Sequence, residues 1–190
     1  MASFWLNSVL LVGLSGLTAA AILSHETPDL SQVKVGADAT DHASLDLLEM
    51  LGQAVVKQAA QVEVNEADLN DYLARSLKPE PRGRTGQFAR FDRLLLDLED
   101  GHCTAYFCWN VLGHTDVISV QFSIQRKGNE FIIEIERGAY GNLQVSRGFL
   151  TPAIPAMREV VRACKPEIDA IFKLPHIRIA KDKLVMDAKF

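Results

Sequence analysis

The spacing of hydrophobic residues changes along the chain, from helical repeats near the start to alternation in the middle. Residues 2–23 form a continuous run without a charged side chain. In 41–61 and 66–77, apolar residues recur every three or four positions, which predicts two amphipathic helices. Asn65 is a suitable N-cap for the second helix, and 62–64 is predicted as a short strand before it.

In the middle of the chain the apolar period becomes two, which predicts antiparallel strands joined by short turns. The clearest strand contains Ile118, Val120, Phe122 and Ile124, which alternate with serine and glutamine. The predicted strands cover 91–99, 102–111, 117–125, 131–138 and 142–146.

A long C-terminal helix is predicted to begin at Thr151 and Pro152, which suit the capping position and the first position of a helix. Its apolar positions continue to Phe172, and Pro166 should kink or divide it. Two further strands joined by a turn close the chain. Because each strand has one apolar face, we expect an α+β fold in which a curved antiparallel β-sheet wraps around this long helix.

The uncharged N-terminal run has two interpretations. At about 1.5 Å per residue, a helix over 1–23 spans the roughly 30 Å hydrocarbon core of a bilayer, which favours an N-terminal transmembrane helix. The alternative is a cleaved signal peptide with a site near 19–21, although no Lys or Arg precedes the apolar run. With an anchor, 24–40 is a linker and 41–190 a single exported α+β domain, and 24–190 lie on the extracytoplasmic (periplasmic) side.

Composition excludes one class of function. The chain has 190 residues, 48% of them hydrophobic, with 20 basic and 24 acidic side chains. Residues 24–61 carry 2 basic and 6 acidic side chains, whereas 62–190 carry 18 of each. No segment has the strong basic excess of a nucleic-acid-binding protein, so no nucleic acid is expected as a partner.

The sequence carries no motif typical of an enzyme, a nucleotide site or a metalloprotease. His102, His114 and Asp116 are the best candidates for a metal cluster, and we interpret them as solvated loop residues. The carboxylates of 97, 99 and 100 are interpreted in the same way. We therefore expect no catalytic residue, no metal site and no cofactor.

The three cysteines are Cys103, Cys108 and Cys164. Because Cys103 and Cys108 are five residues apart on one predicted strand, they point to opposite faces and cannot pair with each other. Either one of them meets Cys164 in an oxidising compartment, or all three are small buried side chains.

Two features suggest a binding surface. The first is a basic segment over 75–93, in which Arg82, Arg84 and Arg90 are candidates for contact with anionic headgroups; the alternative is a solvated basic loop. The second is the apolar space between the long helix and the sheet, which is either a packed core or a groove for an acyl chain. The residues predicted to line this groove are Phe122, Ile133, Ile154, Met157, Val161 and Ile168.

The order of elements and two short motifs resemble a known group of proteins. The motifs are VNEADLNDYLA over 64–74 and GAYGNLQVSRGFLTPAIPAMREVV over 138–161. They are similar to the small exported, membrane-anchored bacterial proteins of the YpmS and LmeA kind, which are similar in turn to TULIP-type lipid-binding folds. The resemblance implies a bent sheet around a long helix, with Asn70 as the group's helix asparagine. It also implies binding of lipids or other amphiphiles in the cell envelope, without catalysis.

Two hypotheses of function follow. In the first, a non-enzymatic, membrane-anchored domain binds a lipid or another amphiphile. In the second, the chain is an accessory subunit of a larger membrane protein complex, with a filled core and no ligand. Gly13, Ser15 and Gly16 would give its N-terminal helix a small-residue face for close packing against partner helices.

Overall fold

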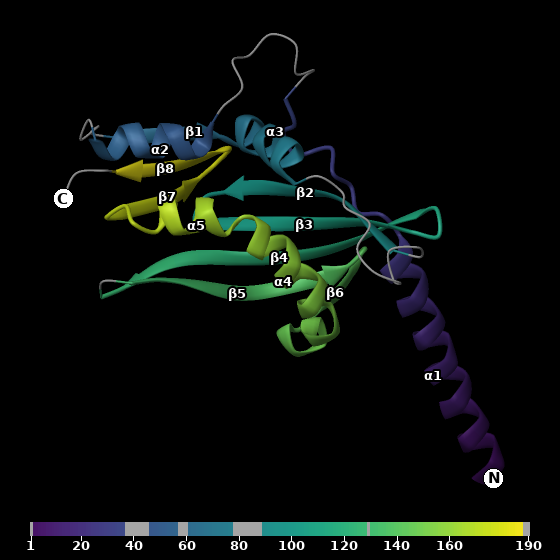
Figure 1. Cartoon of the computed structure of the whole chain (residues 1–190). Coiled ribbons are helices and arrows are strands. Elements are labelled where there is room, and N and C mark those ends of the chain that lie inside the picture. The colour runs from purple at the N-terminus through teal and green to yellow at the C-terminus, as the bar shows by residue number, and fades with distance from the viewer. Residues whose placement is uncertain (1, 37–45, 57–60, 78–88, 129, 188–190) are drawn as a thin grey trace.

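The computed structural model describes residues 2–36, 46–56, 61–77, 89–128 and 130–187. The fold is α+β, as predicted, but it contains two antiparallel sheets instead of one (Figure 1). The larger sheet has five strands in the order β2-β3-β4-β5-β6, and the smaller has three in the order β1-β8-β7. The strands are β1 (Val62–Asn65), β2 (Ala89–Glu99), β3 (His102–Val111), β4 (His114–Lys127), β5 (Glu130–Tyr140), β6 (Leu143–Val145), β7 (His176–Ala180) and β8 (Lys183–Asp187).

The alternation in the sequence sets which face of the large sheet packs on the core. Ala105 lies opposite Val120, and Cys103 lies opposite Phe122, so these side chains share the inner face. The core joins this face to the small sheet, to the helices over 47–56, 66–76 and 154–163, and to the 3-10 helix over 147–153. Its most deeply buried apolar members include Leu47, Leu51, Val64, Cys103 and Met186. The helices are α1 (Ala2–His25), α2 (Leu47–Val56), α3 (Glu66–Ser76), α4 (Ile154–Ala163) and α5 (Lys165–Ile171), with the 3-10 helix η2 (Arg147–Ala153) before α4.

Two fully buried polar side chains of α3 cover the outer edge of β2. The Asn70 side chain accepts a hydrogen bond from Leu96 N at 2.7 Å and donates to Leu96 O at 2.8 Å. The Glu66 carboxylate accepts hydrogen bonds from Leu98 N and from Lys34 N, both at 2.7 Å. The two side chains thus satisfy edge groups that a further strand would otherwise pair.

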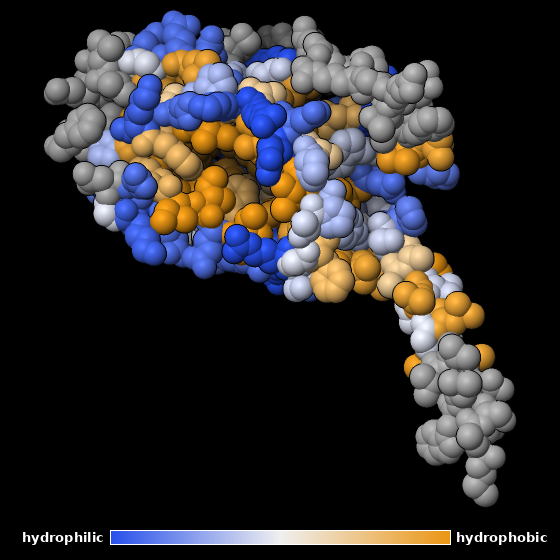
Figure 2. All heavy atoms as spheres, turned by 60° about the horizontal axis from the view of Figure 1, so that its bottom comes forward, coloured by the Kyte–Doolittle hydropathy of each residue, from blue (hydrophilic) through white to orange (hydrophobic). Residues whose placement is uncertain are grey.

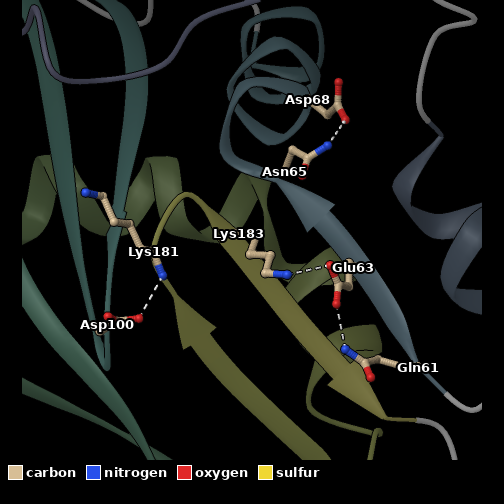
Figure 3. Close-up of polar contacts among 7 residues, drawn as sticks. All are labelled: Gln61, Glu63, Asn65, Asp68, Asp100, Lys181 and Lys183. Atoms are coloured by element: carbon tan, nitrogen blue, oxygen red, sulfur yellow. Dashed lines mark hydrogen bonds and ion pairs between the residues drawn. The ribbon is translucent and has the colours of Figure 1, made fainter.

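The small sheet is bonded to the end of the same strand. Asp182 N donates to Leu98 O at 2.8 Å, and Gly101 N donates to Ile179 O at 3.0 Å. The backbone of Lys181 donates to the carboxylate of Asp100, which Figure 3 shows beside the β7–β8 turn. The turn of one sheet therefore continues the hydrogen bonding of the other.

The prediction of one long C-terminal helix, wrapped by the sheet, is wrong. The segment is divided into η2, α4 and α5, which lie across one face of the large sheet (Figure 1). Pro166 has no N–H to bond the carbonyl of Arg162, and Cys164 leaves helical geometry at φ −88° and ψ 8°. The division at Pro166 is the part of the prediction that the structure confirms.

The predicted transmembrane anchor is also contradicted. Across the part of the chain that the structure describes, no helix has both the length and the apolar character that crossing a membrane requires. The last turn of α1 is bonded to the large sheet: Asn142 N donates to Leu23 O at 2.9 Å, and His25 Nδ1 lies 3.1 Å from Asp116 Oδ1. The assignments that depended on the anchor, a single-pass protein with 24–190 on the extracytoplasmic side, are withdrawn with it.

Gly141 makes the contact between α1 and the sheet possible. It has a φ of +53°, and a Cβ atom there would lie 2.7 Å from both Leu23 O and Ser24 O. Such a distance is far below van der Waals contact, so only glycine fits. The close approach of α1 to the β5–β6 turn therefore depends on this residue.

We expect Asn70→Ala to lower the free energy of unfolding by roughly 2–4 kcal/mol, because it leaves Leu96 N and O without partners in a buried position. The measurement is chemical denaturation followed by circular dichroism. Asn65→Ala is the matched control, because the Asn65 side chain forms no capping bond, and its one hydrogen bond to a described residue goes to Asp68, at 3.4 Å (Figure 3). We expect it to cost less than about 0.5 kcal/mol; equal losses for the two variants would contradict this account of the β2 edge.

Gly141→Ala should loosen the end of α1 and speed tryptic cleavage after Lys34, measured by mass spectrometry. Gly128→Ala is the control, since Gly128 also has a positive φ, of +67°, but no atom lies within 4 Å of a Cβ built there. Both variants carry backbone strain of about 1 kcal/mol. Only Gly141→Ala should raise the cleavage rate, and similar rates for the two would show that α1 does not depend on this contact.

Candidate functional site

A half-open apolar groove lies along β5. In the register of the large sheet, Phe122 lies opposite Ile135 and Ile124 lies opposite Ile133, so the four side chains share the inner face. Because β6 pairs only with Gly138–Tyr140, the stretch of β5 before Gly138 has no further strand beside it among the described residues. The inner face is therefore open to one side along this stretch.

The helices above this face bury little of their apolar surface. Val160 is the one residue of α4 that is fully buried, and α5 has none. Ile154 is 40% exposed and Val161 is 45% exposed on α4, and Ile133 is 45% exposed on β5. Figure 2 looks from the side on which β5 lies in Figure 1, and it shows a hollow of apolar residues bordered by hydrophilic ones.

The six residues predicted to line the groove come from the elements around it: β4, β5, α4 and α5. Ile133, Ile154 and Val161 are exposed, whereas Phe122 and Met157 are partly buried and pack against the core. Ile168 is half-buried on α5. The exposed members are those that an apolar ligand could cover.

One end of the groove is closed. Leu150, in η2, is buried, and a Cβ atom on Gly138 would lie 2.6 Å from its side chain. Gly138 pairs with Val120 on the inner face, so Leu150 fills this face near β6. The groove therefore ends at Leu150 and runs toward the β4–β5 hairpin.

Beside the open stretch of β5, the surface holds a pocket of about 420 Å³ that extends from the β4–β5 hairpin to Arg147 in η2. Arg126 fixes its geometry: Nη1 donates to Pro175 O at 2.5 Å, Nε donates to Gly128 O at 3.1 Å, and the guanidinium lies 6.0 Å from the Phe131 ring centroid. The lining residues are Gln125, Arg126, Lys127, Ile132, Ile133, Glu134 and Arg147. Three of them are cationic. Ile133 is on the inner face and belongs to the groove, whereas Gln125, Ile132 and Glu134 are on the outer face by the register, so the pocket lies across the open edge of β5.

Of the three basic residues predicted to contact headgroups, only Arg90 is described by the structure. Arg82 and Arg84 lie outside the described residues. Arg90 is exposed on β2, which β3 and β4 separate from β5. Sequence reasoning missed Arg126, Lys127 and Arg147, although the sequence QRKG at the β4–β5 turn gave a local signal for the first two.

The histidine candidates do not converge. His102 Nδ1 lies 3.0 Å from Glu136 Oε1, whereas His114 is exposed at the opposite end of β3 and β4, opposite Val111. Asp116 contacts His25 instead. Within the described ranges, no group of three or more His, Cys, Asp or Glu side chains is arranged to hold a metal ion.

The predicted solvated carboxylates differ in their surroundings. Glu99 is exposed, and Asp100 accepts the bond from Lys181 N. Asp97 is half-buried on the outer face, and burial, together with the negative charge of Glu66, raises the pKa of its carboxyl group. No nucleophile or base is bonded to it in the described structure.

A second depression, of about 250 Å³, lies on the small sheet. Its lining residues are Gln61, His176, Arg178, Val185 and Asp187. Val185 is the only apolar side chain among these lining residues, so this depression lacks the apolar surface of the groove.

Comparison with known proteins adds no relative. No protein-family model matches the chain, and no curated protein matches it. The resemblance to proteins of the YpmS and LmeA kind therefore stays a prediction.

All three cysteines are free thiols. Cys103 is buried on the inner face and Cys108 on the outer face, as their spacing predicts, and Cys164 is half-buried where α4 ends. Burial raises the pKa of each thiol, and that of Cys164 to about 11. Neutral thiols are poor nucleophiles, so these positions are not suited to thiolate chemistry near pH 8.

We expect 5,5′-dithiobis(2-nitrobenzoic acid) to label none of the three thiols of the folded chain rapidly at pH 8, and all three in guanidinium chloride. Rapid labelling of Cys103 or Cys108 at pH 8 would contradict their burial.

A second prediction concerns the pH dependence of stability. The folded chain holds the Cys164 proton more tightly than the unfolded chain does, because the pKa of this thiol is raised from 9.0 to about 11. The protonated Cys164 thiol therefore contributes fully to the free energy of unfolding below pH 9, and this contribution is lost as the pH rises through about 11. Titration of the unfolding midpoint between pH 8 and 11, with Cys164→Ala as control, measures this.

Proposed function

We propose that this protein binds the apolar chain of a lipid or another amphiphile in the groove between β5 and the α4–α5 pair, without catalysis. The observation that carries the proposal is the apolar hollow on the side of β5 (Figure 2), together with the exposure of Ile133 on β5 and of Ile154 and Val161 on α4. Large exposed apolar patches are uncommon on soluble proteins, and they often mark sites where a partner or a ligand binds.

The energetics favour an apolar occupant. Removing apolar surface from water is worth about 25 cal/mol per Å². An acyl chain covering these three side chains would gain that stabilisation without requiring the core to repack. The hydrophilic borders keep the headgroup of such a ligand in contact with water.

A second candidate function is that of an accessory subunit of a larger complex. The observation in its favour is on α1, where Leu11, Val12, Leu14, Leu17 and Ile22 are all exposed. A partner protein packed against α1 would cover them. Light scattering of the full chain, purified under mild conditions, tests this candidate, and a purely monomeric species would count against it.

The groove is tested with the full chain and N-phenyl-1-naphthylamine, a neutral probe that fluoresces in apolar surroundings. Ile133→Glu and Val161→Glu should each weaken probe binding by about tenfold or more, because a carboxylate would lie against the apolar ligand. Unfolding midpoints should change little, since both side chains are already exposed. Native mass spectrometry of the purified chain should also show a bound amphiphile.

The control is Leu48→Glu, which makes a comparable change on α2, where the leucine is 38% exposed. It should bind the probe as the unmodified chain does. If all three variants keep full affinity, or if the unmodified chain neither binds the probe nor carries a co-purifying amphiphile, the groove is not a binding site.

A further inference from the structure

We infer that the ligand of this groove is an anionic amphiphile, and that Arg126, Lys127 and Arg147 form the site for its headgroup. The inference rests on the proposed function and names the chemistry of the ligand. It comes from the pocket beside the open stretch of β5, where these three cations and Ile133 line the same space. A ligand in the groove would therefore place one end among positive charges.

The lining residues of the pocket carry three positive charges and one negative charge. Glu134 is the only carboxylate among the lining residues, and its Oε2 accepts a hydrogen bond from Gln125 Nε2 at 2.9 Å. Lys127 lies opposite Glu130 in the register, but the two described side chains form no ion pair. Neither Lys127 nor Arg147 has a side-chain hydrogen bond or ion pair with any residue in the described ranges.

Arg126 is held in place before any ligand binds. Its two hydrogen bonds go to backbone carbonyl oxygens, those of Gly128 and Pro175, which leave its positive charge uncompensated by a carboxylate. Its position over the Phe131 ring adds a cation–π contact. A guanidinium fixed in this way can donate its remaining N–H groups to a carboxylate or a phosphate with little loss of side-chain entropy.

The surroundings of the groove limit where the ligand can lie. Leu150 closes the inner face over Gly138, and the cationic pocket extends from the β4–β5 hairpin, with Arg126 and Lys127, to Arg147 at the start of η2. The acyl chain would lie along Ile133 toward Leu150, with its charged end at Arg126. The chain as a whole carries a net charge of −4, so attraction of an anion depends on this local cluster.

The test measures displacement of N-phenyl-1-naphthylamine from the full chain by three ligands that share a twelve-carbon tail: dodecanoate, dodecyl phosphate and the neutral glycerol monododecanoate. We expect at least one anionic ligand to displace the probe at a concentration about tenfold or more below that of the neutral ligand, since each basic side chain contributes about a factor of five. If dodecyl phosphate displaces the probe at a lower concentration than dodecanoate does, the headgroup is a phosphate. If dodecanoate does so at the lower concentration, the ligand is a fatty acid.

The triple variant Arg126→Gln, Lys127→Gln, Arg147→Gln should lose this preference while still binding the neutral probe and the neutral ligand. The matched control, Arg75→Gln, Arg90→Gln, Lys181→Gln, removes three exposed cations outside the pocket and should keep the preference. Because Arg126 bonds the backbone of Pro175, the pair Lys127→Gln, Arg147→Gln is measured as well and should lose most of the preference without affecting the fold.

The outcomes separate the two proposals. If the unmodified chain binds the neutral and anionic ligands equally, or if the control triple variant loses the preference as fully as the pocket variant, the headgroup site is wrong and the groove remains. If no ligand displaces the probe because the probe itself does not bind, both the groove and the headgroup site are wrong.

Discussion

The burial of Glu66 and Asn70 is the constraint on which much of the remaining structure depends. Neither side chain is exposed, so each of their hydrogen bonds must be made within the protein. Those bonds reach Leu96 and Leu98 on β2 and Lys34 in the segment after α1. Moving α3 would break all of them at once, so the first strand of the sheet, the helix and the N-terminal segment are fixed relative to one another.

This constraint makes the two sides of the large sheet unequal. On one side, α3 and the β7–β8 turn satisfy the edge of β2. On the other side, β6 covers only the last residues of β5, and the stretch before Gly138 is open within the described part of the chain. Since the first side is closed by bonds that are costly to break, the apolar surface that stays open lies along β5, where Ile133 is exposed.

The features that could be predicted from the sequence are the local ones. Alternation at Val120 and Phe122 identified the inner face, because the period of a strand depends only on neighbouring residues. The second sheet was missed, because pairing of β1 with β8 joins Val62 to Met186, far along the chain. The shared pocket of Arg126 and Arg147 could not be predicted for the same reason: the basic residues around Arg82 are close in sequence, whereas Arg147 and Arg126 line one pocket only through the fold.

The division of the C-terminal segment explains why the groove is not filled. A single continuous helix could lie along the sheet and bury one apolar stripe from end to end. Pro166 prevents this, and the chain turns at Cys164, so α4 and α5 are two short helices with separate contacts. The apolar residues on α4, Ile154 and Val161, then lack a complete set of neighbours in the described structure. The feature that contradicts the predicted long helix is thus the one that leaves apolar surface open to a ligand.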